Sequence, residues 1–291
     1  MTTAISIGPL KLELRESDRL PPLLHPFEVE PGERSVTCLC RRGPVQPAQP
    51  ELITLDSGGI WCLERHPRGE RLLLRRGGPG GRAYQQLLLP ADGGPAEARI
   101  DPRLLGPEQP GNDFALREPL LELWACRLLA ERSALLLHAA AVRFGRELWL
   151  FAGQSGAGKS TICRLLDRAG VGRVLCDDRV IVQPRPDGWW AWSTPWHGEA
   201  RFSRPGQGRL ARIFFLQKSP SCLVTDLPFA EGLVRLLGCV FSLEWSAGRI
   251  ERIMDRGTHL LRQVAAQLLS FTPDEALVQL LRQDAGKRVD R

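Results

Sequence analysis

The clearest chemistry in this 291-residue chain lies between Gly153 and Thr161. This stretch reads GQSGAGKST, so a glycine, four residues, a second glycine, a lysine and a serine follow in order. Glycines let the backbone curl until successive N–H groups face one anion, and the N-terminus of a following helix points at the same anion. The pattern predicts binding of ATP phosphates by Lys159 and of Mg²⁺ by the Ser160 hydroxyl. The expected nucleotide contacts are Gly153, Gln154, Ser155, Gly156, Ala157, Gly158, Lys159, Ser160 and Thr161.

Two adjacent carboxylates form a second candidate group. Asp177 and Asp178 end a short apolar run, 18 and 19 residues after Lys159. An acidic residue at the end of a strand beside the phosphate loop is a typical Mg²⁺ ligand. A second carboxylate there can accept the proton of an attacking hydroxyl. The residues alone leave open whether both aspartates act or one only caps a turn.

A histidine precedes Lys159 by 21 residues, in the segment LLLHAAAV. A lone histidine in an apolar strand is more often a core residue than a catalytic one. From its pattern alone, His138 therefore carries no assigned role.

The elements that must position these residues follow from the spacing of apolar residues. Residues 134–152 predict two strands joined by a tight turn at 144–146, and residues 161–169 predict the helix after the loop. Further strands are expected over 171–184, 189–196 and 210–218, and helices over 119–133, 228–239, 257–269 and 274–281. This mixture predicts an α/β (mixed α+β) domain.

The first 90 residues instead show short apolar runs separated by glycine, proline and charge, which predicts a β-rich module. Residues 90–111 are rich in proline and glycine and are expected to form a linker or an irregular crossover. Two domains are predicted. Residues 1–112 form a smaller β-rich module, expected to recognise a peptide or another substrate, and residues 113–291 form the domain that contains the phosphate loop.

Composition limits the class of protein. The N-terminus has no signal-peptide pattern and no apolar run is long enough to cross a bilayer, so we expect a cytoplasmic protein without a membrane partner. The net charge is +6, much of it from arginine. This charge indicates either an anionic partner or a solvated basic surface. No nucleic-acid motif accompanies it, so nucleic acid is not an expected partner.

The order and spacing of His138, the loop at 153–160 and the Cys-Asp-Asp at 176–178 resemble the catalytic domain of HPr kinase/phosphorylase. The resemblance covers residues 134–281 and is tightest over 136–182. It implies a P-loop kinase fold related to phosphoenolpyruvate carboxykinase. It also implies that Asp177 is the general base, that Asp178 lies near the metal and that His138 is catalytic. Because that family forms hexamers, a homo-oligomer is a further expectation.

The chain departs from that family after the aspartates. An ExRG signature is replaced by STPWHGE at 193–199, in which Glu199 is the best candidate for another metal carboxylate and His197 a weaker one. This segment is more similar to divergent relatives found beside peptide-modification genes, some of which phosphorylate a serine of a lasso precursor peptide. Trp190 and Trp192 alternate and are expected on one buried face, whereas Trp196 is expected to line the site. Arg212, Arg256 and His259 are candidate phosphate contacts.

These observations together predict a kinase that transfers the γ-phosphoryl group of ATP, with Mg²⁺, to a hydroxyl. A serine of a peptide or small protein is the expected acceptor. Two alternatives use the same loop: a kinase acting on free serine or another metabolite, and an ATPase or switch protein with no phospho-acceptor. A carboxykinase is disfavoured because no additional lysine–histidine metal pair is evident.

Overall fold

A computed structural model describes residues 1–291 except 18, 106–113, 117, 244–246 and 290–291. Contacts divide the chain into two compact units, Met1–Ala125 and Cys126–Arg291, and each is described here by itself. The sequence suggested a boundary at 112, inside a segment that lies outside the described residues. No helix in the described part of the chain is long and apolar enough to cross a membrane.

The first unit contains a single nine-stranded sheet in the order β3-β1-β2-β4-β9-β8-β7-β6-β5. Most neighbours are antiparallel, while the β2–β4 and β4–β9 pairs are parallel. The strands are β1 (Thr2–Ile7), β2 (Leu10–Arg15), β3 (Glu28–Val29), β4 (Val36–Arg42), β5 (Ile53–Asp56), β6 (Trp61–His66), β7 (Gly69–Arg76), β8 (Arg82–Pro90) and β9 (Ala96–Ile100). Short 3-10 turns are η1 (His25–Phe27), η2 (Pro50–Leu52) and η3 (Pro102–Leu104). The β-rich character expected for this region is therefore confirmed.

One expectation for this unit was wrong. The segment 90–111, expected to be a linker or crossover, contains β9, which lies in the interior of the sheet between β4 and β8. Its small residues Ala96 and Ala98 alternate with charged ones and are buried with Ile100. Small apolar residues give a weak alternation signal, and the neighbouring prolines and glycines hid it.

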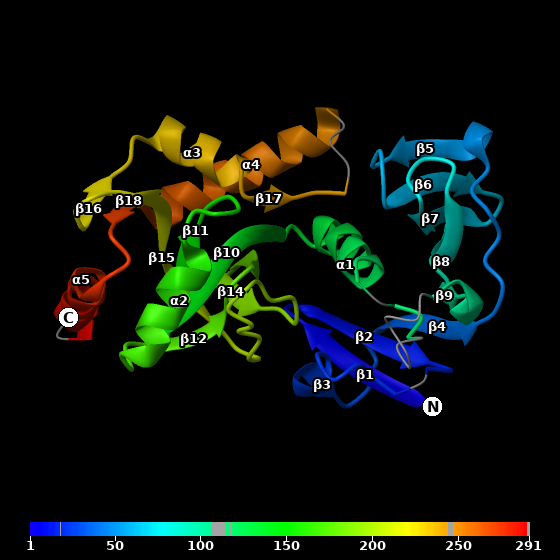
Figure 1. Cartoon of the computed structure of the whole chain (residues 1–291), viewed down its shortest axis with the longest axis horizontal. Coiled ribbons are helices and arrows are strands. Elements are labelled where there is room, and N and C mark those ends of the chain that lie inside the picture. The colour runs from blue at the N-terminus through cyan, green and yellow to red at the C-terminus, as the bar shows by residue number, and fades with distance from the viewer. Residues whose placement is uncertain (18, 106–113, 117, 244–246, 290–291) are drawn as a thin grey trace. The chain divides into compact units, whose positions relative to one another are not determined.

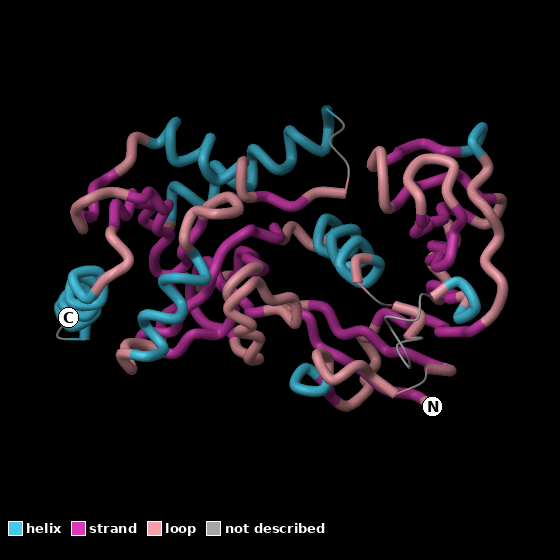
Figure 2. Tube along the Cα trace, in the orientation of Figure 1, coloured by secondary structure: helices cyan, strands magenta, loops and turns pink. Residues whose placement is uncertain are grey.

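The second unit has a central mixed sheet with helices on both faces (Figures 1 and 2). Its strands are β10 (Leu135–Phe144), β11 (Glu147–Ala152), β12 (Arg173–Cys176), β13 (Arg179–Arg185), β14 (Gly188–Ser193), β15 (Gln207–Lys218), β16 (Leu223–Asp226), β17 (Val240–Phe241) and β18 (Ala265–Phe271). Its helices are α2 (Lys159–Arg168), α3 (Phe229–Leu237), α4 (Ala247–Gln263) and α5 (Glu275–Val289). The helix α1 (Leu120–Glu131) spans the boundary between the units.

Two cores explain this layering. Leu135, Leu137 and Leu150 belong to one buried cluster, which also contains Leu236 of α3 and Leu260 of α4. The alternate strand residues join a second cluster that is completed by α2 and α5: Ala140, Val142, Trp149, Phe151, Phe214, Ile162, Leu166, Leu277 and Leu281. Because side chains of a strand point alternately to its two faces, a strand that is apolar at nearly every position must be covered on both.

Strand β11 has neighbours on both edges. It pairs antiparallel with β10 and parallel with β15, and the pairings β10–β13, β13–β14 and β14–β15 connect those two neighbours to each other. Strand β15 continues the sheet to β18 and β16. The phosphate loop therefore begins at the end of an interior strand.

The expected helix over 257–269 was partly wrong. The helix α4 begins at Ala247 and ends at Gln263, and residues 265–271 form β18, which pairs in parallel with β15. Leu268 packs toward one core, and Leu269 and Phe271 belong to the other. An apolar run that is buried on both faces cannot be told from a helix by its periodicity alone.

The tryptophans of β14 also differ from expectation. Trp189, rather than Trp190, is buried in the core beside α4, with 1% of its surface exposed. Trp190 and Trp192 share the other face, where the Arg185 guanidinium lies 4.6 and 4.8 Å from the two ring centres. A cation over two indoles stabilises this face. The expected burial is confirmed for Trp192, with 5% of its surface exposed, whereas Trp190 is only half-buried.

Candidate functional site

The loop between β11 and α2 has a backbone that demands glycine. Gly156 and Gly158 have φ of 79° and 105°, which side chains other than glycine rarely adopt. A Cβ on Gly158 would lie 2.6 Å from Phe271 Cζ, and one on Gly153 would lie 2.7 Å from the Ala157 Cβ. Glycine is therefore required at 156 and 158 by the backbone conformation, and at 153 and 158 by the lack of space for a side chain.

The first turn of α2 points its amides at the pocket. The first hydrogen bond of the helix joins the Ile162 N–H to the Gly158 carbonyl at 2.9 Å. The N–H groups ahead of that bond have no partner within the helix, as at any helix N-terminus. With the helix dipole they favour an anion at this position.

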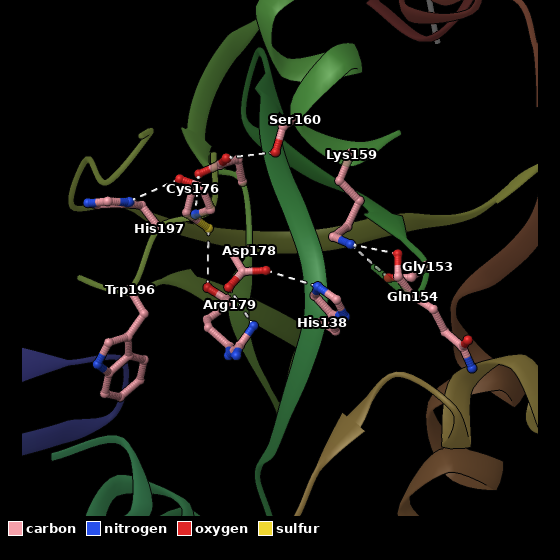
Figure 3. A network of polar contacts seen from close by, with 12 residues as sticks. His138, Gly153, Gln154, Lys159, Ser160, Cys176, Asp178, Arg179, Trp196 and His197 are labelled. Carbon is pink, nitrogen blue, oxygen red and sulfur yellow. Dashed lines mark hydrogen bonds and ion pairs between the residues drawn. The ribbon is translucent and has the colours of Figure 1, made fainter. Parts of the chain in front are cut away.

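Lys159 lies folded back along the loop (Figure 3). Its Nζ donates to the carbonyls of Gly153 and Gln154 at 2.9 and 3.0 Å, and 5% of the residue is exposed. Burial lowers the pKa of this lysine, because desolvation disfavours the charged form. An anion bound in the loop would stabilise the positive charge of Lys159 more strongly than the two carbonyl dipoles do.

Asp177 is a buried carboxylate, 1% exposed, that accepts four hydrogen bonds. One comes from the Ser160 hydroxyl at 3.0 Å. The other three come from the backbone amides of Gly198, Ala200 and Phe202 at 3.0, 2.9 and 3.2 Å. A carboxylate has about four acceptor positions, so this one is fully engaged. Asp177 therefore ties the Ser160 side chain to the segment 198–202.

Asp178 has a different set of partners (Figure 3). Its Oδ1 lies 2.9 Å from His138 Nε2, and its Oδ2 accepts from Arg179 Nη1. The antiparallel register of β10 and β13 sets His138 opposite Arg179, which brings the histidine to the aspartate. Each carboxylate oxygen keeps acceptor capacity beyond these contacts.

The charge state of Asp178 follows from the same contacts. Burial acts to raise the pKa of this carboxyl. The hydrogen bond from His138 and the positive charges of Arg179 and Lys159 outweigh burial, so the net pKa lies below its usual range. Asp178 is thus an ionised carboxylate at neutral pH, held at the wall of the pocket by two cationic or proton-donating side chains.

These groups surround one pocket of about 280 Å³. It is lined by His138, Ser155, Gly156, Gly158, Lys159, Ser160, Thr161, Asp177, Asp178, Gly198, Glu199 and Lys218. The sequence reasoning missed Lys218 and Gly198. The signal for Lys218 was available, because it ends a buried strand parallel to the strand of the loop, and the ends of such strands meet at one edge.

Most sequence-predicted residues meet at this pocket, and a few others lie beside it. Gly153, Gln154 and Ala157 form the loop without lining the pocket. Glu199 is exposed at the rim, while His197 is exposed and its Nδ1 contacts the Gly198 carbonyl. In the described part of the chain, no group of three or more histidine, cysteine, aspartate and glutamate side chains is arranged to hold a metal.

Several further candidates lie elsewhere. Trp196 is buried rather than lining the pocket, with 3% of its surface exposed. Arg212 pairs with Asp284, and His259 contacts Gln263. Arg256 donates to the Ala130 carbonyl. These contacts engage them away from the phosphate loop.

No model of a known protein family matches this chain, and no curated protein matches it either.

Proposed function

We propose that this protein is an ATP-dependent kinase that phosphorylates a hydroxyl, with a serine of a peptide or small protein as acceptor. The observation that carries the proposal is the meeting of a glycine-shaped loop, Lys159, Ser160 and two aspartates at one pocket. The resemblance in the order and spacing of these residues supports phosphotransfer, and the similarity at 193–199 supports a peptide acceptor.

In this proposal the loop amides and Lys159 bind the phosphates of ATP. Lys159 leaves the carbonyls of Gly153 and Gln154 and donates to the nucleotide instead. The residues present suit Mg²⁺, since hydroxyl and carboxylate oxygens are its usual ligands, and Ser160 would hold it with a carboxylate nearby. When bound, Mg²⁺ would neutralise charge on the phosphates.

The contacts favour the opposite division of roles from the one that the resemblance implied for the aspartates. Asp177 already accepts four hydrogen bonds and positions Ser160, which suits a residue on the metal side of the pocket. Asp178 keeps acceptor capacity and lines the pocket, which suits a residue that accepts the proton of a hydroxyl. The acceptor oxygen attacks the γ-phosphorus, its proton passes to Asp178, and the bond to the ADP oxygen breaks. His138 positions the base.

The test is phosphotransfer from labelled ATP to a library of serine-containing peptides, with free serine as a second acceptor, analysed by mass spectrometry. Asp178→Asn is expected to lose at least about 100-fold in kcat while ATP affinity changes little, because general-base catalysis contributes about that much. Asp255→Asn, an exposed aspartate on α4, serves as the matched control. Unchanged turnover in Asp178→Asn would overturn the base assignment.

Three outcomes separate the alternatives. Phosphate on a peptide supports the proposal, and phosphate on free serine alone indicates a metabolite kinase. Release of inorganic phosphate without any acceptor indicates an ATPase or switch protein. If ATP with Mg²⁺ does not bind at all, the reading of the loop itself is wrong.

A further inference from the structure

A cleft in the second unit gathers arginines that the phosphate site does not use. It has a volume of about 410 Å³ and is lined by Arg127 and Glu131 of α1, Leu243, and Arg249, Arg252 and Arg256 of α4, with Ala130. None of these residues lines the pocket at the phosphate loop. Among the described residues that line this cleft, four guanidinium groups are therefore accompanied by a single carboxylate.

Arg256 is held at this cleft at a cost. Its Nη2 donates to the Ala130 carbonyl at 3.0 Å, which fixes the guanidinium against the last turn of α1. Its Nη1 is buried, and within the described residues it has no hydrogen-bond partner. Burial lowers the pKa of Arg256, and the charges of Arg249 and Arg252 lower it further. A buried cationic donor without an acceptor costs free energy that a bound anion would offset.

Arg252 adds an available charge. It is exposed, and no hydrogen bond or ion pair is found for it in the part of the chain that the structure describes. Glu131 does little to neutralise the positive charge of the arginines in this cleft, because it is 62% exposed and lies 4.0 Å from Arg127. An exposed pair at that distance contributes little.

The spacing of the arginines indicates the size of the anion. Arg249, Arg252 and Arg256 follow at intervals of three and four residues, so they share one face of α4. Seven residues of helix extend about 10 Å. An extended peptide covers that length in about three residues, so carboxylates on alternate residues would reach successive arginines. A single phosphate would reach only part of the row.

We propose that this arginine cleft binds an acidic segment of a polypeptide, at a site separate from the phosphate loop. Charge complementarity carries the choice of partner. A nucleic acid is disfavoured because none of the described residues that line the cleft is aromatic, so none of them could stack on a base. The proposal does not depend on phosphotransfer, since its test is binding.

The test measures fluorescence anisotropy of a labelled hexaglutamate peptide with the full chain in 0.1 M KCl. Arg252→Gln is expected to weaken binding about tenfold, the loss of one charge-assisted hydrogen bond. Arg262→Gln removes an equal charge from an exposed position of α4 outside the cleft and is expected to change affinity less than twofold. Arg256→Lys, which keeps the charge but not the fork of donors, should also weaken binding.

Competition decides between ligands. Excess ATP with Mg²⁺ should leave the peptide bound, whether or not the phosphate loop is occupied. Absence of peptide binding, or equal losses in Arg252→Gln and Arg262→Gln, would overturn the proposal. Displacement by inorganic phosphate or by oligodeoxythymidine at concentrations no higher than that of the peptide would also overturn it, because the cleft would then select phosphate.

Discussion

At the scale of single residues, Asp177 and Asp178 show how two adjacent carboxylates acquire different hydrogen-bond partners. They are adjacent in the chain, yet one is saturated by backbone amides and the other faces a histidine and an arginine. Both lie in the turn between β12 and β13 and both line the pocket, but their carboxylates have different hydrogen-bond partners. We expect substitutions of the two to fail in different ways.

Asp177→Asn should mainly destabilise the fold. The amide that replaces one oxygen presents N–H groups to backbone donors, which leaves buried donors unsatisfied, so we expect a loss of about 3 kcal/mol in unfolding free energy. Urea denaturation measures it. The control is Asp187→Asn, whose exposed carboxylate accepts from the Trp190 ring nitrogen alone among the described residues, and it should cost less than about 1 kcal/mol. Similar midpoints for the two variants would contradict this role.

Asp178 should give stability a defined pH dependence. Its pKa is depressed in the folded protein, so its contribution is present above the unfolded pKa, about 3.9, and is lost as the pH falls through the folded value. The margin in unfolding free energy between the wild type and Asp178→Asn should therefore be constant from pH 8 to 5 and narrow below about pH 4. A margin that widens on acidification would show the sign to be wrong.

Gly158 tests the steric reasoning about the loop. Gly158→Ala places a methyl group against the Phe271 ring and forces alanine to a φ of 105°. We expect nucleotide affinity to fall at least tenfold, measured by calorimetry with ATP and Mg²⁺. Phe271→Leu together with Gly158→Ala should recover part of that loss, because the ring contact is relieved while the backbone strain remains. No recovery would assign the whole effect to the backbone.

The sequence predicted the residue types of this site better than their partners. The loop and the aspartate pair were identifiable because their spacing is local and their chemistry distinctive, whereas His138 was identified only through the resemblance. The roles of the aspartates were not identifiable, because their partners come from residues 198–202 and from β10, and no local pattern encodes which carboxylate meets which. Lys218 was missed although its place at the end of a buried strand was a usable signal.

At the scale of elements, the sheet of the first unit contains a buried ion pair that no pattern in the sequence predicted. Arg71, 3% exposed, forms an ion pair with Glu64, 1% exposed, and also donates to the Gln86 side chain and the Pro47 carbonyl. The two residues face each other across β6 and β7. Removal of one partner leaves a buried charge, which is strongly destabilising.

Arg71→Met should therefore lower the unfolding free energy of this unit by about 3 to 5 kcal/mol. Arg68→Met is the matched control, since Arg68 pairs with Glu97 at an exposed position, 55% open to solvent, and should cost less than about 1 kcal/mol. Chemical denaturation followed by circular dichroism compares them. Equal losses of unfolding free energy in the two variants would mean that leaving Glu64 without Arg71 does not destabilise the sheet.

The types of elements were predicted correctly where apolar residues recur on one face of the element. The prediction failed where both faces are buried or where the buried side chains are small. The helix α1 and the hairpin of β10 and β11 were confirmed. Strand β18 was taken for helix because both of its faces are covered, and β9 was hidden by its alanines. These failures arise from tertiary contacts, which a local window does not contain.

At the scale of the whole molecule, two compact units share one chain, and the helix α1 crosses from one to the other. The composition suggested a boundary at the proline- and glycine-rich stretch, whereas contacts divide the chain at Ala125. Such composition marks irregular backbone, and an irregular segment need not coincide with the division between cores.

If the phosphate loop binds nucleotide, its stabilisation should be confined to the second unit. ADP with Mg²⁺ at 100 times its Kd adds about 2.7 kcal/mol to the folded state that binds it. Hydrogen exchange followed by mass spectrometry should then show added protection in β10, β11 and β15 and none in β5 to β8. Equal protection in both units would indicate that they unfold as one.

The position of β11, with a partner strand on each edge, has a consequence for how the loop works. A strand at the rim of a sheet can bend or peel away by giving up one set of hydrogen bonds, whereas β11 must give up two. The first residues of the loop are therefore preorganised. Most of the conformational entropy of this segment is lost during folding, so little more is lost when a ligand binds. If the protein is a kinase, as proposed, movements that limit its turnover should originate instead in residues 197–202, which reach Asp177 from an irregular segment.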